Sequence, residues 1–273
     1  MTNSPLIIVL DIDGTIIGNI SPQASLFDLQ QQIKTDPNKA AKLNLVDVKS
    51  LRYKLSNGII RPHVKHFITN TKAEYFIYTA SSNEWANFLV PHIESVLGVK
   101  FNRPLMTRNH CDLSPNATQK SKAKIDKIVF NCLKKKYKDN HPSFESVKNN
   151  MLIIDNNPEV YNAKDLESTV VCSSYTFLYP ENVPAKLNEE TFSNYKHLIE
   201  TKAETHRDFE YEFYKIYVDT IKYLDRYNNK SRSDRFFYLL TNILNTRFKN
   251  NQTLSHRDVR YISKYISSNE IHK

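Results

Sequence analysis

Four short apolar runs interrupt an otherwise mixed pattern of polar and hydrophobic positions. They cover residues 6–10, 75–78, 151–154 and 169–172. Runs of this length, rich in Val, Ile and Leu and without polar alternation, are typical of strands buried on both faces of a parallel sheet. Helical patterns separate the runs, so the sequence predicts βαβ crossovers and an α/β fold.

The polar residues that follow these runs are the candidates for chemistry. Asp11 follows the first run, Thr79 the second and Asp155 the third, while Ser173 and Ser174 follow the fourth. The carboxyl ends of parallel strands meet at one edge of a sheet, where α/β proteins bind their ligands. We therefore expect these residues to lie around one site.

The segment between the first two strands, residues 23–65, could overhang that site. It contains a predicted helix at residues 26–33 and a hairpin-like stretch at residues 51–60 that turns at Asn57-Gly58. An amphipathic stretch with Val64, Phe67 and Ile68 leads into the second strand.

The chain changes character after Pro184, where four helical patterns follow at residues 187–202, 205–227, 233–247 and 255–266. The second pattern carries an apolar stripe formed by Phe209, Phe213, Ile216, Tyr217, Ile221 and Leu224. Such a stripe usually packs on a core and less often binds a partner. We expect a catalytic α/β domain at residues 1–184 and a helical accessory region at residues 185–273.

The cysteine and hydropathy patterns indicate an intracellular protein, cytoplasmic or nuclear. Cys111, Cys132 and Cys172 are odd in number and widely spaced, which fits a reducing compartment. No apolar run approaches the length of a signal-peptide core or a membrane-spanning helix. We expect no membrane partner, and the oligomeric state is not predicted.

The net charge of +9 is concentrated in residues 100–148, where twelve Lys and Arg stand against four Asp and Glu. A basic stretch can attract a phosphorylated or nucleic-acid partner. Lysine runs such as residues 134–136 are equally typical of solvated helix faces. Both interpretations stay open.

The motif Asp11-Ile12-Asp13-Gly14-Thr15 pairs two carboxylates at a strand end. Both can face one site only where the chain leaves extended geometry, which Gly14 permits. Asp11 can attack phosphorus and form an aspartyl-phosphate. Asp13 can protonate the leaving oxygen and then activate water, a role that typically contributes ~10²- to 10⁴-fold in rate. A leaving phosphate ester needs this proton, whereas a halide does not, so Asp13 favours phosphate chemistry.

An anionic nucleophile that approaches a phosphate needs counter-charge. Each pair of unit charges ~4 Å apart repels by about 4 kcal/mol at an effective dielectric of ~20. Mg²⁺ prefers oxygen ligands and keeps several waters. Its predicted protein shell is Asp11, the Asp13 carbonyl oxygen and Asn156, with Asp155 behind Asn156, and a lysine should complete the neutralisation.

Over residues 5–180 the chain resembles the haloacid-dehalogenase (HAD) superfamily, and specifically the RNA polymerase II C-terminal-domain phosphatases of the FCP/SCP type. Three segments carry the resemblance: Arg61-Pro62, Tyr78-Thr79-Ala80-Ser81 and Ile154-Asp155-Asn156-Asn157-Pro158. That branch usually has Glu where this chain has Gly14. The resemblance implies a HAD-like (Rossmannoid) parallel sheet flanked by helices, and similar chains occur in large DNA viruses.

The resemblance also implies roles for individual residues. Asp11, Asp13, Thr79 and Lys120 would be catalytic, with Thr79 hydrogen-bonded to the transferring phosphoryl group. The phosphate-binding set would be Thr15, Thr79, Ala80 and Lys120, and the magnesium set Asp11, Asp13, Asp155 and Asn156. Lys120, Lys122, Lys124 and Lys127 all suit the family's lysine, and we choose Lys120 with Lys122 in reserve.

Three functions are considered. The first is a Mg²⁺-dependent phosphomonoester hydrolase that acts on phosphoserine or phosphothreonine in proteins. The second is a nucleic-acid or nucleotide phosphatase, which the basic residues 100–148 favour. The third is a catalytically silent HAD-fold module that binds a partner through its helical tail, which the complete set of motifs disfavours.

Overall fold

The computed structural model describes residues 5–18, 20–34, 46–114, 117–177, 179, 222, 224–248 and 254–270. Its centre is a parallel sheet with the strand order β2-β1-β5-β6. The strands are β1 (Leu6–Leu10), β2 (Ala73–Ile77), β5 (Met151–Asp155) and β6 (Thr169–Val171). Val9 of β1 lies opposite Phe76 on one side and Ile153 on the other. The predicted α/β fold and its four parallel strands are confirmed.

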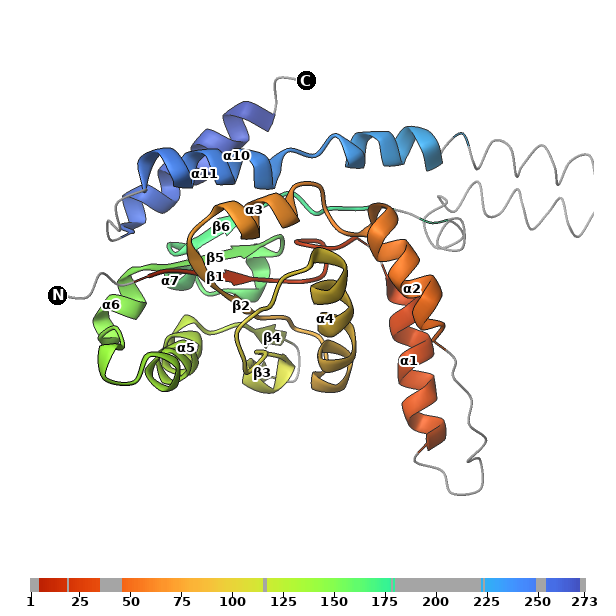
Figure 1. Ribbon diagram of the computed structural model, residues 1–273, viewed down its shortest axis with the longest axis horizontal. Helices are drawn as coiled ribbons and strands as arrows, with labels where there is room; N and C mark the ends of the chain where they lie inside the picture. Colours follow the sequence, from red (N-terminus) through yellow and green to blue (C-terminus); the bar gives the residue numbers. More distant parts are fainter. Residues whose placement is uncertain are drawn as a thin grey trace, which may run out of the picture.

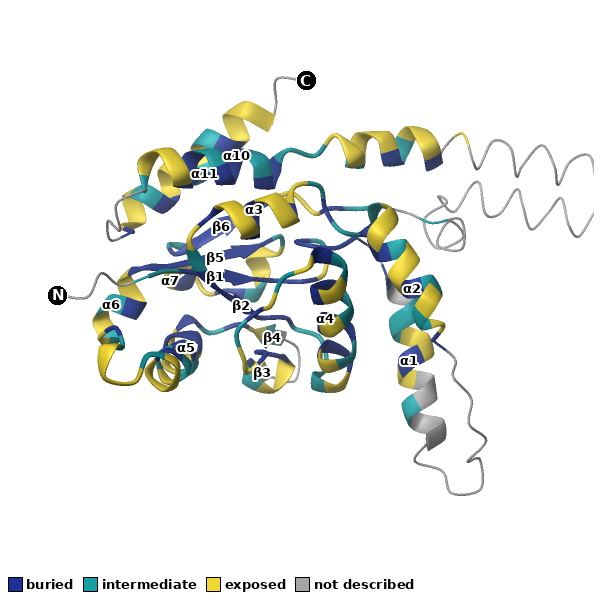
Figure 2. Ribbon diagram, viewed as in Figure 1, coloured by how far each residue is buried: buried dark blue, intermediate teal, exposed yellow. Residues whose placement is uncertain are grey.

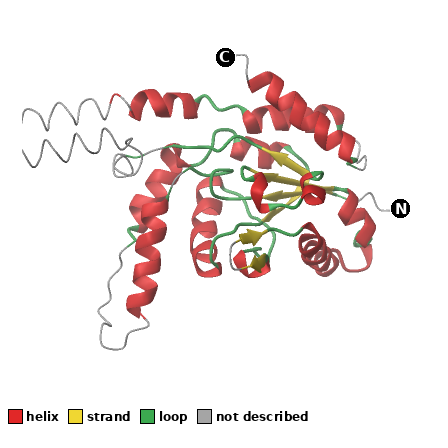
Figure 3. Ribbon diagram, turned by 180° about the vertical axis from the view of Figure 1, so that it is seen from behind, coloured by secondary structure: helices red, strands yellow, loops and turns green. Residues whose placement is uncertain are grey.

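Helices cover both faces of this sheet (Figures 1 and 3). The helices before β5 are α1 (Ser21–Lys34), α2 (Val48–Lys54), α3 (Val64–Asn70), α4 (Asn83–Leu97), α5 (Lys122–Tyr137) and α6 (Phe144–Asn149). The later helices are α7 (Ala163–Leu166), α10 (Phe236–Arg247) and α11 (His256–Glu270), and residues 224–232 are also helical. A hairpin of β3 (Asp112–Ser114) and β4 (Ala117–Gln119) precedes α5.

Alternate residues of β1 enter two separate hydrophobic cores, because successive side chains of a strand point to opposite faces. Ile8 and Leu10 pack with residues of α3, α4, α10 and α11. Ile7 and Val9 pack with residues of α5 and α6. The strands are therefore buried on both faces (Figure 2), as a continuous apolar run predicts.

The predicted hairpin at residues 51–60 is wrong. The segment forms α2, whose N-terminus is capped by the Asp47 carboxylate, and then a π-helical turn, Leu55–Ile59. Leu51, Leu55 and Ile59 are buried at intervals of four residues, which is helical spacing. Asn57 and Gly58 leave helical geometry at a kink inside this turn; Gly58 has a φ of 118°, and a Cβ there would lie 2.3 Å from the Phe177 ring. The glycine thus permits close packing and does not form a hairpin turn.

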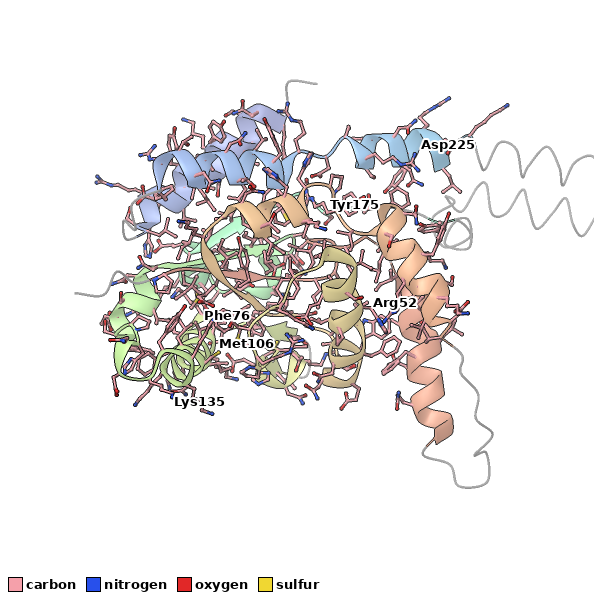
Figure 4. All side chains as sticks on the ribbon, viewed as in Figure 1. Arg52, Phe76, Met106, Lys135, Tyr175 and Asp225 are labelled. Carbon is pink, nitrogen blue, oxygen red and sulfur yellow. The ribbon has the colours of Figure 1, made fainter. Side chains whose placement is uncertain are left out.

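Side-chain contacts of α1, α2 and the segment after β6 attach the insertion, which comprises α1, α2 and the Leu55–Ile59 turn, to the rest of the domain. Figure 4 shows Arg52 between α2 and α4, where its Nε donates to His92 Nδ1 at 3.2 Å. Tyr175, also labelled there, donates to the Gly58 carbonyl at 2.6 Å. Phe27 of α1 contacts the rings of Trp85 and Phe88 in α4. The predicted helix at residues 26–33 is part of α1.

The C-terminal helices lie on the same face of the sheet as α3. α10 packs against α3, and α11 packs against β6 (Figure 1). They correspond to the patterns predicted at residues 233–247 and 255–266. The pattern at 187–202, the boundary at 184 and most of the apolar stripe lie outside the described residues; Leu224, the one described member of the stripe, is buried. The division at residue 184 stays a prediction.

All three cysteines are free thiols. In the described parts of the chain, no helix combines the length and the apolar character needed to cross a membrane.

Candidate active site

The loops that follow β1, β2 and β5 meet at the carboxyl edge of the sheet. Asp11 donates its backbone N–H to the Ile154 carbonyl at 3.0 Å, and Tyr78 donates to the Leu10 carbonyl at 2.9 Å. These bonds extend the strand pairing to the motif residues themselves. Asp11, Thr79 and Asp155 are all buried there, as their positions after three adjacent strands predict.

Lys120 lies between two carboxylates of this edge. Its Nζ donates to Asp11 Oδ1 at 2.6 Å, to Asp155 Oδ2 at 2.7 Å and to the Tyr78 carbonyl at 2.9 Å. The side chain is 2% exposed. The three donors of the ammonium group therefore all have partners, and the cation links β1, β2 and β5.

The other candidate lysines lie elsewhere. Lys122 pairs with Asp126 one turn along α5, Lys124 pairs with Asp112 of β3, and Lys127 is exposed. Lys120 precedes α5 and is held by its backbone N–H, which donates to the Val160 carbonyl at 2.7 Å. Of the four, the structure brings Lys120 to the motif carboxylates.

Asp155 accepts hydrogen bonds at both carboxylate oxygens. Oδ2 accepts from Lys120 and from the Tyr161 hydroxyl at 2.9 Å, and Oδ1 accepts from the Asn157 N–H at 2.8 Å. A carboxylate engaged in this way can orient its neighbours, and its place behind the metal shell stays a prediction.

Asp11 shares its second oxygen with the neighbouring polar groups. The Thr15 hydroxyl lies 3.1 Å from Asp11 Oδ2 and 3.0 Å from Asn156 Oδ1, and it accepts from the Asn156 N–H at 3.1 Å. Burial raises the pKa of Asp11 to about 7 against the attraction of Lys120, and the charges of Asp155 and Asp13 raise it further. One ammonium group thus pairs with two carboxyl groups, and the nearby Asp13 adds to the negative charge around them.

Asp13 is directed toward solvent at the mouth of the site. Its Oδ2 accepts from the Ser81 hydroxyl at 2.9 Å, and the Ser81 N–H donates to Thr79 Oγ1 at 3.1 Å. Partial desolvation raises the pKa of Asp13, and the hydrogen bond from Ser81 opposes this shift. A carboxyl group with a raised pKa can carry the proton that a general acid must deliver.

Gly14 permits the close approach of the first and third motifs. Its φ is 77°, and a Cβ at this position would lie 2.5 Å from Asn156 Nδ2. The positive φ favours glycine, and any side chain here would also have to displace the Asn156 amide. The Gly that departs from the usual FCP/SCP motif therefore suits the packing of this chain.

A cavity of about 550 Å³ opens beside Asp13. Its walls come from the first motif, from α1, from the N-terminus of α4 and from the segment after β6; they include Asp13, Asp28, Ser81, Trp85, Arg108, Ser174 and Thr176. The insertion thus forms a wall of the candidate substrate site. Arg108 is held by a hydrogen bond from Nε to the Ala80 carbonyl at 2.9 Å.

Several side chains of the site were not anticipated. Ser174, directly after a predicted strand, was expected at the site, whereas Ser81 was predicted only as the last residue of the Tyr78-Thr79-Ala80-Ser81 segment. No sequence pattern predicted the roles of Tyr161, Arg61 and Arg108, because their contacts depend on how distant loops pack. Arg61 was noted only as part of Arg61-Pro62, yet it is buried next to the site.

More than half of the basic residues in 100–148 pair with acids. Lys100 and Arg103 pair with Glu94, Lys136 pairs with Glu74, and Lys148 lies 3.8 Å from Glu145. Together with the pairs of Lys122 and Lys124, these contacts disperse the charge excess over several elements. The structure thus favours the interpretation of solvated and paired helix faces for much of this stretch.

Comparison with known proteins identifies the family. The model of the NLI interacting factor-like phosphatases matches residues 6–210. Among solved structures, the chain is similar to fission yeast Fcp1, an RNA polymerase II CTD phosphatase, bound to beryllium fluoride (14% identity, TM-score 0.37, 97% of this chain and 62% of that one). A second Fcp1 structure gives 16% identity and a TM-score of 0.38 over 95% of this chain and 70% of that one.

The chain thus spans less than two thirds of the first of these structures. No curated protein sequence matches it. Neither comparison addresses the viral origin, which stays a prediction. Because the family model covers most of the chain, including every motif described above, the protein belongs to the NLI interacting factor-like phosphatase family.

Proposed function

We propose that this phosphatase hydrolyses phosphoserine or phosphothreonine in protein segments through an aspartyl-phosphate on Asp11. The observation that carries the proposal is the placement of Lys120 Nζ within 2.6 Å of Asp11 and 2.7 Å of Asp155, next to an open cavity. A buried ammonium group beside the nucleophile can neutralise the phosphate as it arrives.

In the first step, a carboxylate oxygen of Asp11 attacks phosphorus, and the bond from phosphorus to the ester oxygen breaks. Asp13 delivers a proton to that oxygen, so the serine or threonine leaves as an alcohol. In the second step, Asp13 takes a proton from water, the water oxygen attacks the phosphorus, and the bond to Asp11 breaks. Phosphate leaves, Asp11 is again a carboxylate, and Asp13 again carries the proton that it delivered in the first step.

The donor set fits Mg²⁺. Asp11, the Asp13 carbonyl and the Asn156 amide offer hard oxygen atoms. No group of three or more His, Cys, Asp or Glu that could hold a metal occurs among the described residues, so water would supply much of the shell. When bound, the ion would polarise the phosphoryl group and offset its charge. Thr79 and the residues that follow it, Ala80 and Ser81, would orient the phosphoryl oxygens.

The lining of the cavity favours a protein substrate over a nucleic acid. Two carboxylates, those of Asp13 and Asp28, face it together with one guanidinium group, that of Arg108. A nucleic acid brings a phosphate at every nucleotide, and carboxylates repel a polyanion. A peptide with a single phosphate meets this repulsion only at the site where Lys120 compensates it.

The test is phosphate release from matched phosphopeptides, nucleotides, 5′- and 3′-phosphorylated oligonucleotides and sugar phosphates, with Mg²⁺ or with EDTA. We expect Mg²⁺-dependent release that is fastest from phosphopeptides. Faster release from oligonucleotides, with a strong dependence on salt, would favour the nucleic-acid function. If the chain releases phosphate from none of these, the catalytic proposal fails and the silent binding module remains.

A further inference from the structure

Arg61 is a fully enclosed cation whose guanidinium nitrogens all have hydrogen-bond partners. Nε and Nη2 donate to the two carboxylate oxygens of Asp234 at 2.9 and 2.8 Å. Nη1 donates to the Ser173 carbonyl at 3.0 Å and to the Thr15 carbonyl at 3.4 Å, and Nη2 also reaches the Ser173 hydroxyl at 3.2 Å. The residue is 1% exposed, so this pairing is shielded from solvent.

The two loops that Arg61 joins are those that fix the amide of Asn156. Thr15 places its hydroxyl 3.0 Å from Asn156 Oδ1, and Ser174, the neighbour of Ser173, accepts from Asn156 Nδ2 at 2.8 Å. One loop therefore fixes the oxygen end of the amide and the other fixes its nitrogen end. Arg61 holds both loops by donating hydrogen bonds to the backbone carbonyls of Thr15 and Ser173.

The counter-charge for Arg61 comes from the C-terminal helical region. Asp234 precedes α10, and it lies 173 positions from Arg61 in sequence. Among the described residues, no other carboxylate lies within ion-pair distance of Arg61. The same region contacts the loop after β6 a second time, because the Ser231 hydroxyl donates to the Thr176 carbonyl at 2.5 Å. Thr176 lines the cavity.

We propose that Asp234 is a positioning residue of the active site, which acts through Arg61 to hold the Thr15 and Ser173 loops and thereby the Asn156 amide. The C-terminal helical region is then a working part of the phosphatase. This inference rests on the proposed function in one respect, namely that Asn156 offers its amide oxygen to Mg²⁺.

The physical reason is the cost of leaving a buried guanidinium group without its carboxylate. Removing one partner of a buried ion pair leaves an uncompensated charge, which draws in water or moves toward solvent. Either response would release the two carbonyls that Arg61 holds. Residues that orient metal ligands in this indirect way typically change metal affinity by ~10- to 100-fold when they are replaced.

Two substitutions test the inference, and they disturb the contacts of Arg61 to different extents. Asp234→Asn removes the charge but keeps the shape, and Ser173→Ala removes only one hydrogen bond to Arg61 and preserves the ion pair. Glu74→Gln is the matched control, because Glu74 is also a buried acid paired with a cation, Lys136, but it lies near the opposite, amino end of the sheet. Mg²⁺ binding is measured by isothermal titration calorimetry, and kcat and KM are measured on an aryl phosphate at several Mg²⁺ concentrations.

We expect Asp234→Asn to weaken the Kd for Mg²⁺ by about tenfold or more and Ser173→Ala to weaken it by a few-fold. Saturating Mg²⁺ should restore most of kcat, whereas Glu74→Gln should leave the Kd for Mg²⁺ unchanged. A purely structural role would lower the melting temperature in all three variants without this selective change. Circular dichroism reports whether each variant is folded, and if Asp234→Asn unfolds, Ser173→Ala still tests whether the contacts of Arg61 hold the metal site.

The inference is overturned if folded Asp234→Asn and Ser173→Ala bind Mg²⁺ as the unsubstituted protein does. It is also overturned if Glu74→Gln weakens binding equally. If the unsubstituted protein neither binds Mg²⁺ nor releases phosphate, the proposed function fails first, and the role of Asp234 fails with it. Binding without turnover would leave the positioning role intact while refuting the catalytic one.

Discussion

Lys120 Nζ lies 2.6 Å from Asp11 Oδ1, although 109 positions separate the two residues in the sequence. The contact joins the end of β1 to the residue before α5, and it does so in a buried environment where an unpaired charge is costly. Because Lys120 also pairs with Asp155, the buried cation matters for both the stability of the fold and the chemistry proposed for the site.

Replacing Asp11 should separate activity from stability. We expect Asp11→Asn to abolish hydrolysis of an aryl phosphate, because the amide cannot attack phosphorus. The melting temperature should not fall, since burial already penalises the charged form and raises the pKa of Asp11 to about 7. Stopped assays of phosphate release and thermal unfolding measure the two effects, and retained turnover would remove Asp11 from the nucleophile role.

Replacing Lys120 should lower both the activity and the stability of the protein. Lys120→Met leaves Asp11 and Asp155 without their shared cation, which should cost about 3 to 5 kcal/mol in the free energy of unfolding and abolish turnover. Lys124→Ala is the matched control, because Lys124 pairs with Asp112 near the surface and its loss should cost under about 1 kcal/mol. Equal activity of the two variants would show that Lys120 is not the phosphate-binding lysine.

Glu94 should make the stability of the fold depend on pH. Burial acts to raise its pKa, but hydrogen bonds from Arg103, from the Phe101 N–H and from Lys100 outweigh it, so the pKa lies below the ordinary 4.5. The carboxylate thus stabilises the fold above about pH 4.5, and this contribution disappears as the pH falls through the lowered pKa. Glu94→Gln should cost about 2 kcal/mol at pH 7.

The predicted pH dependence is checked by denaturant unfolding of Glu94→Gln and of the unsubstituted protein at pH 7 and at pH 3.5. The gap in the free energy of unfolding should be smaller at the lower pH. A gap that is constant or that widens would contradict the sign of the shift.

The charge of the cavity should influence peptide preference. Asp28 faces the cavity from α1, so Asp28→Lys should raise kcat/KM for phosphopeptides with acidic neighbours relative to basic ones by roughly fivefold, a modest effect expected for solvated charges. Glu84→Lys makes the same charge change at an exposed position outside the cavity lining. If both variants shift the preference equally, general electrostatics and not the cavity is responsible.

The sequence predicted the strands well because their signal is local. The run Leu6–Leu10 is apolar throughout, as burial on both faces demands, and the residues after it could be assigned to the functional edge. The insertion was harder to predict because Asn57-Gly58 is typical of a hairpin turn. Its helical outcome depends on Leu51, Leu55 and Ile59 reaching the core, which is a tertiary effect.

The same distinction applies to the site. Asp11, Asp13, Thr79 and Asp155 stand at predictable strand ends, whereas the choice among four lysines required the path of the β3–β4 hairpin. Arg61 and Asp234 come from segments that no sequence pattern pairs. Residues next to strand ends are thus predictable, and residues that brace loops from a distance are not.

Trp85 is the single tryptophan of the chain, and it lines the cavity while contacting Phe27 of α1. Its indole emission therefore reports on one place alone, the wall between the insertion and the active site. Titrating a phosphopeptide into the Asp11→Asn protein and following this emission would provide an optical assay of substrate binding without any label. The protein thus contains its own fluorescent probe for occupancy of the cavity.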